Sequence, residues 1–151
     1  MIKEINITDQ EETFDLLFKL KEKKHYDLEV RFKNVDLIKL NKLVKGKPFR
    51  KNDLYVNATT LFEIMQPLGS QGRHHYHDLK PEEIHNVLIT LQNSKKVIPS
   101  IDDRYVVLTT VIASCGHPLI AIIDTHSPLM NDRNANINKL VTLYPKDIEE
   151  K

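Results

Sequence analysis

The spacing of hydrophobic and polar residues predicts a helix, a strand and a loop in the first fifty positions. Residues 8–11 carry a capping-box pattern, and hydrophobic residues follow at helical spacing, which predicts a helix over about residues 9–24. Hydrophobic and polar residues then alternate over residues 26–32, which is typical of a half-buried strand. Residues 42–51 are rich in lysine and include a glycine and a proline, so we expect a basic loop or linker there.

The pattern then predicts two further helices and a series of strands. Asn57 is expected to cap a short helix over residues 58–65. Pro81 is expected to start the next helix, because glutamates follow in the first turn and hydrophobic residues recur at helical spacing as far as Asn93. Beyond it, runs rich in β-branched residues lie between turn signals, which predicts strands. These strands are expected over residues 97–101, 104–113, 119–125 and 137–144.

Short links between the strands favour antiparallel neighbours, because a parallel pair needs a crossover of about a dozen residues or more. We therefore expect an α+β fold in which two helices precede a four-stranded antiparallel meander sheet, with an N-terminal helix and strand as an extension. Residues 1–16 carry a net charge of −4 and residues 17–53 a net charge of +7. This shift predicts an accessory helix and strand with a basic linker over residues 1–52, followed by the main domain over residues 53–151.

Composition narrows the function classes only a little. The formal net charge is +1, so bulk charge gives no argument for a nucleic acid or a membrane. Cys115 is the only cysteine, which excludes an intrachain disulfide framework and a cysteine-based zinc module. Residues 105–123 are as long as a membrane-spanning helix, but the turn residues 114–118 at their centre favour two strands, and we expect no membrane contact. The N-terminus also lacks the apolar stretch of a signal peptide, so we expect a cytoplasmic protein.

Histidines are concentrated in one short segment. His74, His75 and His77 follow Arg73 directly, and histidine exchanges protons near neutral pH, so this run is suited to acid-base chemistry beside an anion such as phosphate. A solvated loop with one ring bonded to a backbone carbonyl is the alternative. A zinc site is less favoured, because adjacent loop histidines rarely converge on one ion and the His-Glu-x-x-His spacing is absent. We expect neither a metal nor another cofactor.

The last predicted strand carries a second polar signal. Val141 and Leu143 share the face that is expected to join the core, whereas Thr142 and Tyr144 point to the opposite face. Both hydroxyls are able to donate to a phosphate. Both residues also have high strand propensity, and from this strand alone a purely structural role is the better interpretation.

Three short motifs resemble a known group of proteins. They are Arg73 to Leu79, Arg104 to Leu108 and Val141 to Pro145. Together with the order of elements, they resemble the phage-associated branch of the barnase, EndoU, colicin and RelE superfamily of metal-independent ribonucleases, over roughly residues 57–145. The resemblance implies that helices pack on one sheet face and that RNA binds the open face.

The resemblance also implies roles for individual residues. The three loop histidines become the acid-base candidates, Thr142 and Tyr144 become phosphate ligands, and Arg73, Lys80 and Arg104 become substrate-binding candidates. The expected reaction is attack of the ribose 2′-hydroxyl on the adjacent phosphorus, which leaves a 2′,3′-cyclic phosphate. The expected partners are RNA and, for a phage-derived or toxin-type nuclease, an inhibitor or antitoxin protein.

Two other function classes stay open at this point. In a non-catalytic module that binds nucleic acid or protein, the basic run over residues 39–51 would do the binding and the histidines would be incidental. In a metal-dependent hydrolase, the histidine run would hold the ion. Activity in the presence of a chelator separates the two kinds of enzyme, and loss of activity on replacing histidine separates both from the binding module.

Overall fold

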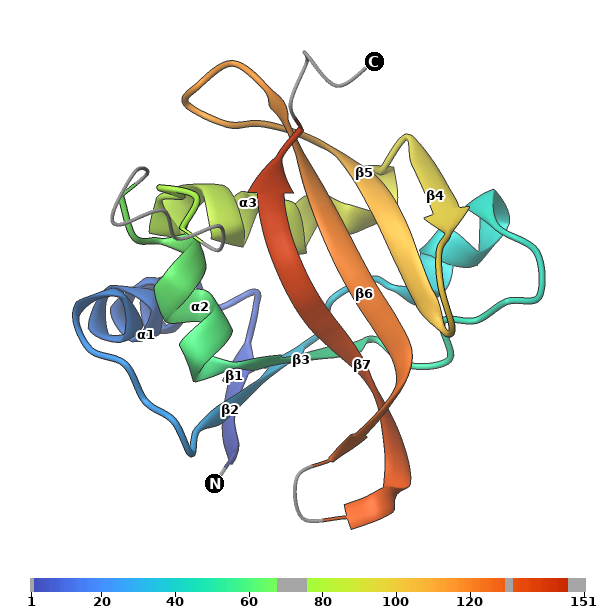
Figure 1. Cartoon of the computed structure of the whole chain (residues 1–151), viewed down its shortest axis with the longest axis horizontal. Helices are drawn as coiled ribbons and strands as arrows, with labels where there is room; N and C mark the ends of the chain where they lie inside the picture. The colour runs from blue at the N-terminus through green and yellow to red at the C-terminus, as the bar shows by residue number, and fades with distance from the viewer. Residues whose placement is uncertain (1, 68–75, 130–131, 147–151) are drawn as a thin grey trace.

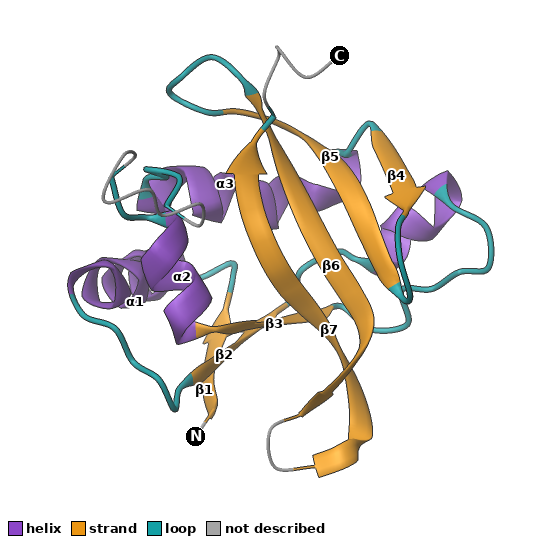
Figure 2. Ribbon diagram, viewed as in Figure 1, coloured by secondary structure: helices purple, strands orange, loops and turns teal. Residues whose placement is uncertain are grey.

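A computed structural model describes residues 2–67, 76–129 and 132–146 of the chain. The helices in this part are α1 (Gln10–Glu22), α2 (Ala58–Ile64) and α3 (Pro81–Thr90), with 3-10 helices η1 (Ile38–Leu43) and η2 (Leu91–Asn93). The strands are β1 (Ile2–Asn6), β2 (Glu29–Lys33), β3 (Asp53–Asn57), β4 (Lys96–Pro99), β5 (Arg104–Ile112), β6 (Pro118–Leu129) and β7 (Asp132–Pro145). Figure 1 shows the arrangement of these elements along the chain, and Figure 2 separates helices from strands by colour.

The strands of the described residues form one mixed sheet of seven strands, in the order β1-β2-β3-β7-β6-β5-β4. The pairs β1 with β2 and β3 with β7 are parallel, and the other neighbouring pairs are antiparallel. The expectation of a four-stranded antiparallel meander with a separate N-terminal extension is therefore wrong. Strands β4 to β7 do pair in sequence, but β3 adds the N-terminal strands to the same sheet through the pair Tyr55 and Lys139.

Strands β1 and β3 were not predicted from the sequence, and there are physical reasons for this. Within β1 only Ile5 is buried, so the strand offers no alternation by which to recognise it. Strand β3 does alternate, with Leu54 and Val56 buried, but it follows directly on the lysine-rich segment and immediately precedes α2. A strand of 5 residues in that position is easily taken for part of a linker.

Local capping explains where the helices begin. The Asp9 carboxylate accepts a hydrogen bond of 3.1 Å from the backbone N–H of Glu12, so Asp9 rather than Thr8 caps α1. At α3, Pro81 occupies the first turn and the Glu83 carboxylate accepts from the backbone N–H of Lys80 at 2.8 Å. Both helices then bury one face, which is the amphipathic pattern that predicted them.

One apolar cluster joins segments from both ends of the chain. Ile5, Leu17 and Phe32 from the first fifty residues are buried together with Leu61 and Leu143 from the remainder. Helix α1 also contacts α2 and α3. The division into an accessory layer over residues 1–52 and a main domain over residues 53–151 stays a prediction.

The apolar segment over residues 105–123 forms most of β5 and β6, as the turn residues predicted. The turn closes where the backbone N–H of Ala113 donates to the carbonyl of His117 at 2.8 Å, with Gly116 at a φ of +92°. Of the helices described here, none has the length and apolar character needed to cross a bilayer.

A bulge in β7 changes which side chains face the core. Ile122 pairs with Thr142, but the next residue of β6 pairs with Leu140, so Val141 is an extra residue in its strand. Leu140 and Leu143 are consequently both buried, and Val141 is only half-buried. The expectation that Val141 shares the core face with Leu143 is wrong, because the alternation restarts at the bulge.

Candidate active site

The candidate site lies on one face of strands β5, β6 and β7. Helix α3 contacts β5 and passes behind these strands in Figure 1, so it leaves the face turned toward the viewer uncovered, and α2 lies against β7 beside that face. We call this the open face. Buried residues such as Ala121 and Leu143 point toward α3, so their neighbours along each strand point to the open face. Facing pairs on the open face are Ile120 with Tyr144, Ile122 with Thr142, Asp124 with Lys139, and Arg104 with Asp124.

At one end of the open face, a loop histidine lies against the last strand. The ring centroids of His77 and Tyr144 are 5.9 Å apart, with an angle of 39° between the ring planes. The backbone fixes this loop to α2, because Asp78 N–H donates to the carbonyl of Gln66 at 2.8 Å and Leu79 N–H donates to the carbonyl of Ile64 at 3.0 Å. The Leu79 side chain is buried, which anchors the loop further. Thr142 lies two residues before Tyr144 on the same side of β7.

The candidate residues from the sequence therefore divide into four groups, of which Arg104 is described in the next paragraph. His77, Thr142 and Tyr144 come together at one end of the open face. Lys80 lies just beyond the loop, with its ammonium group 3.6 Å from the Asp78 carboxylate. The nominated residues Arg73, His74 and His75 lie outside the described residues.

Arg104 belongs to the opposite end of the open face. It starts β5 and pairs across the sheet with Asp124, whose carboxylate is 3.9 Å from the Arg104 guanidinium. Asp124 and Ile120 are four residues apart on β6, a distance of about 13 Å in a strand. Arg104 is therefore too far from Tyr144 to hold the same phosphate.

The Arg104 end of the open face contains polar residues that the sequence did not nominate. Lys139 lies there with its ammonium group 3.5 Å from Oε1 of Glu29, a carboxylate that is only 1% exposed. The Asn57 amide, in the orientation that satisfies both neighbours, donates to the same oxygen at 3.0 Å and accepts from Lys139 at 3.2 Å. Oε2 of Glu29 is buried and meets no hydrogen-bond donor among the described residues.

A histidine held by a carboxylate lies at the same end. Nδ1 of His126 is 3.5 Å from the Asp103 carboxylate and 3.0 Å from the Thr125 hydroxyl. The backbone N–H of His126 also donates to Asp124 at 2.9 Å. Nothing in the sequence indicated that the His126 ring would contact Asp103, because Asp103 lies in the loop between β4 and β5, far from His126 in the chain.

A third polar group links strands β2 and β3, and its member Tyr55 pairs with Lys139 across the sheet. Arg31 donates to Asp53 through Nε at 3.2 Å and Nη2 at 2.5 Å, and also donates to Glu4. Chiefly the hydrogen bond to Asp53 raises the pKa of Arg31 above its ordinary value. Burial, opposed by the nearby Arg31 charge, raises the pKa of Tyr55 above its ordinary value.

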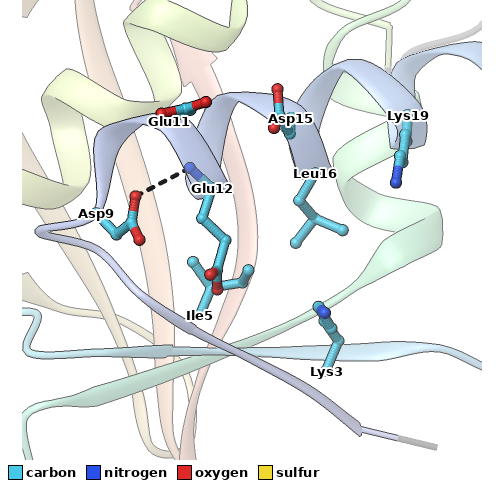
Figure 3. Close-up of a pocket in the computed structure, with 8 residues that line it drawn as sticks. All are labelled: Lys3, Ile5, Asp9, Glu11, Glu12, Asp15, Leu16 and Lys19. Atoms are coloured by element: carbon cyan, nitrogen blue, oxygen red, sulfur yellow. Dashed lines mark hydrogen bonds between the residues drawn. The ribbon is translucent and has the colours of Figure 1, made fainter.

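A separate hollow of about 410 Å³ lies between α1 and β1, away from the open face. Figure 3 shows its lining, which includes the acidic residues Asp9, Glu11, Glu12 and Asp15 at the N-terminal end of α1. Acidic residues are favourable in the first turn of a helix, where backbone N–H groups lack partners, and the Asp9 carboxylate already caps this helix. A structural role accounts for Asp9, Glu11 and Glu12.

Within the ranges 2–67, 76–129 and 132–146, there is no group of three or more His, Cys, Asp or Glu side chains placed to hold a metal ion. Comparison of the chain with known protein families, with curated proteins and with solved structures found no match.

Proposed function

We propose that this protein is a metal-independent endoribonuclease whose reaction takes place at the His77 end of the open face. The observation that carries this proposal is the contact between His77 and Tyr144, which come from distant parts of the sequence and whose ring centroids are 5.9 Å apart. A histidine and two hydroxyl groups on an uncovered sheet face form a set that is able to exchange a proton and bind one phosphate. The resemblance of three short motifs to the barnase, EndoU, colicin and RelE superfamily supports the same reaction.

The proposed reaction is attack of the ribose 2′-hydroxyl on the adjacent phosphorus. A base takes the 2′-hydroxyl proton, the bond to the 5′-oxygen breaks, and an acid gives that oxygen a proton. The products are a 2′,3′-cyclic phosphate and a 5′-hydroxyl end. His77 acts as the base or the acid, and the hydroxyls of Thr142 and Tyr144 donate to the phosphate oxygens as negative charge grows.

We also propose that the protein acts in a reducing cytoplasm. Cys115 is exposed in the turn between β5 and β6 and has no second cysteine in the chain with which to pair. A ribonuclease in the same compartment as cellular RNA needs to be restrained. An inhibitor or antitoxin protein that covers the open face is the partner that we propose for this purpose.

The test is incubation of the full-length protein with total RNA in excess EDTA, followed by mapping of the new ends. We expect 2′,3′-cyclic phosphate and 5′-hydroxyl ends. His77→Ala is expected to lower the rate by about 10²-fold or more, because general acid-base catalysis contributes about that much. His117→Ala, in the turn between β5 and β6, is the matched control and is expected to keep full activity.

Three results would overturn the proposal. Cleavage that needs added metal would identify a metal-dependent hydrolase instead. Full activity after combined replacement of His74, His75 and His77 would remove these three histidines from the mechanism. Binding of RNA without any cleavage would favour the non-catalytic module.

A further inference from the structure

A second hollow opens at the Arg104 end of the open face. It has a volume of about 280 Å³ and lies where β3 leaves β7 and continues into α2. We call it the Lys139 hollow. Its lining comes from five elements and consists of Asn57, Thr60, Arg104, Asp124, Ser127, Lys139, Leu140 and Val141. The bulge at Val141 contributes to the lining, because it turns that residue out of the core.

The charges in this hollow are balanced. Lys139 faces the Glu29 carboxylate at 3.5 Å, and Arg104 faces the Asp124 carboxylate at 3.9 Å. Each cation thus already has an anionic neighbour, so the hollow carries little net positive charge to attract a free phosphate. A ligand that is neutral but rich in hydrogen-bonding groups matches it better.

The uncharged part of the lining points to the same kind of ligand. The hydroxyls of Thr60 and Ser127 are able to donate and to accept, and Val141 adds one aliphatic residue that is turned out of the core, whereas Leu140 keeps its side chain in the core. Mixed donors and acceptors beside one aliphatic residue suit the edge of a nucleobase, with room for part of its plane.

We propose that the Lys139 hollow binds one unpaired nucleobase of a single-stranded RNA substrate. This inference rests on the proposed function for the choice of RNA, but the binding step is independent of cleavage. The hollow is about 13 Å along the strands from the row of Tyr144, so the bound base belongs to a nucleotide other than the one that is cut. Bases in an RNA duplex are stacked and paired, so only a single strand is able to insert one.

The buried carboxylate behind the hollow holds its main donor in place. Glu29 is 1% exposed, and its Oε1 accepts from the Asn57 amide and forms an ion pair with Lys139. Lys139 is itself only 22% exposed, so its ammonium group is held in one direction before any ligand arrives. A donor that is already ordered loses less conformational entropy when a base binds.

The experiment is an NMR titration of the full-length, isotope-labelled protein with the four ribonucleosides, and separately with inorganic phosphate. We expect at least one nucleoside to shift the backbone amide signals of Asn57, Thr60, Ser127 and Lys139, and phosphate to leave them unchanged. Arg104→Gln is expected to weaken nucleoside binding by about tenfold, because it removes a charged hydrogen-bond donor. Arg50→Gln, at an exposed position in the loop before β3, is the matched control.

A second pair of variants tests the same hollow independently, in case Arg104→Gln fails to fold. Thr60→Val removes only a hydroxyl from the hollow, and it is expected to weaken the same nucleoside by a few-fold, whereas Thr110→Val at an exposed position of β5 leaves binding unchanged. Amide spectra of each variant report whether the fold is kept.

The outcomes separate this inference from the proposed function. Nucleoside binding at the hollow in a protein that never cleaves RNA supports the inference and contradicts the proposed function. RNA cleavage by a protein in which no nucleoside shifts the amide signals at the hollow supports the proposed function and contradicts the inference. Shifts caused by phosphate but by no nucleoside would make the hollow an anion site and overturn the inference.

Discussion

His77 packs its ring against Tyr144 with 5.9 Å between centroids, although one residue belongs to the loop before α3 and the other to the last strand. Such ring contacts add about 0.5–1.5 kcal/mol beyond the area that they bury. The contact therefore helps to hold the loop at the open face. It also places the two rings side by side, which is the geometry on which the proposal of a shared phosphate rests.

The contact makes Tyr144→Phe an informative change, because it keeps the ring and removes only the hydroxyl. We expect unchanged stability and a rate of RNA cleavage about 10²-fold lower, since the lost donor acts on the transition state. The rate is measured with a fluorescent oligoribonucleotide in EDTA, and stability by urea unfolding.

Tyr26→Phe is the matched control, because that residue is 75% exposed and belongs to the loop between α1 and β2 rather than to β5, β6 or β7. It is expected to match the parent protein in both measurements. Equal rates for the two variants would show that the Tyr144 hydroxyl has no part in the reaction.

The pair formed by Glu29 and Lys139 leads to a prediction about stability. Each single change, Glu29→Gln or Lys139→Gln, leaves one charged group without its partner in a largely buried setting. We expect each to cost about 1–3 kcal/mol in the free energy of unfolding. The double variant is expected to cost less than the sum of the two, because neither charge is then left unpaired.

Urea unfolding of the parent, the two single variants and the double variant measures this coupling. The pair Lys39→Gln and Asp36→Asn, on the exposed side of η1, provides a control cycle with an expected coupling of less than about 0.5 kcal/mol. Additive costs for Glu29 and Lys139 would mean that the buried pair contributes no net interaction.

The sequence pattern predicted the three α-helices and most of the length of strands β4 to β7, because each of these elements buries one regular face. Leu17 and Leu20 in α1 lie at helical spacing, and Val107 and Thr109 in β5 lie at strand spacing. The order of the strands in the sheet could not be predicted from the hydrophobic periodicity, because the parallel pair Tyr55 and Lys139 joins segments that are far apart in the chain. Periodicity reports which face is buried and says nothing about which strand is the neighbour.

The candidate site was predictable only as a set of residue types. The run containing His77 and the pair Thr142 and Tyr144 stood out as polar groups near expected loops and strands. Their mutual distance depends on how the loop is anchored to α2, which no local pattern encodes. Lys139 was not predicted as a site residue because its neighbours in the sequence are typical of a core strand. Glu29 was not predicted because the alternation places it on the solvent side of its strand, whereas it is buried.

The shared core leads to a prediction about truncation. A chain beginning at Asn52 lacks Ile5, Leu17 and Phe32, all of which are buried in the same cluster as Leu143. Each buried side chain of this size contributes about 1.5–3 kcal/mol, and a domain has only about 5–15 kcal/mol of net stability. We therefore expect residues 52–151 alone to show no cooperative unfolding by circular dichroism.

Addition of residues 1–51 as a separate peptide is the control, and it is expected to restore cooperative unfolding. A folded and active fragment over residues 52–151 would instead establish the N-terminal part as an accessory layer.

Tyr55 leads to a prediction about alkaline pH. Burial is the largest cause that raises the pKa of Tyr55 above its ordinary value of 10.0, and carboxylates of Asp53, Glu4 and Glu29 act in the same direction. The folded protein therefore holds the phenol proton more tightly than the unfolded chain. The stability that this contributes is complete below pH 10.0 and is lost as pH rises through the folded-state pKa.

The free energy of unfolding is measured with urea across this pH window. We expect it to fall less steeply with pH for Tyr55→Phe than for the parent. Tyr26→Phe is expected to keep the parent slope, and equal slopes for all three proteins would contradict a raised pKa at Tyr55.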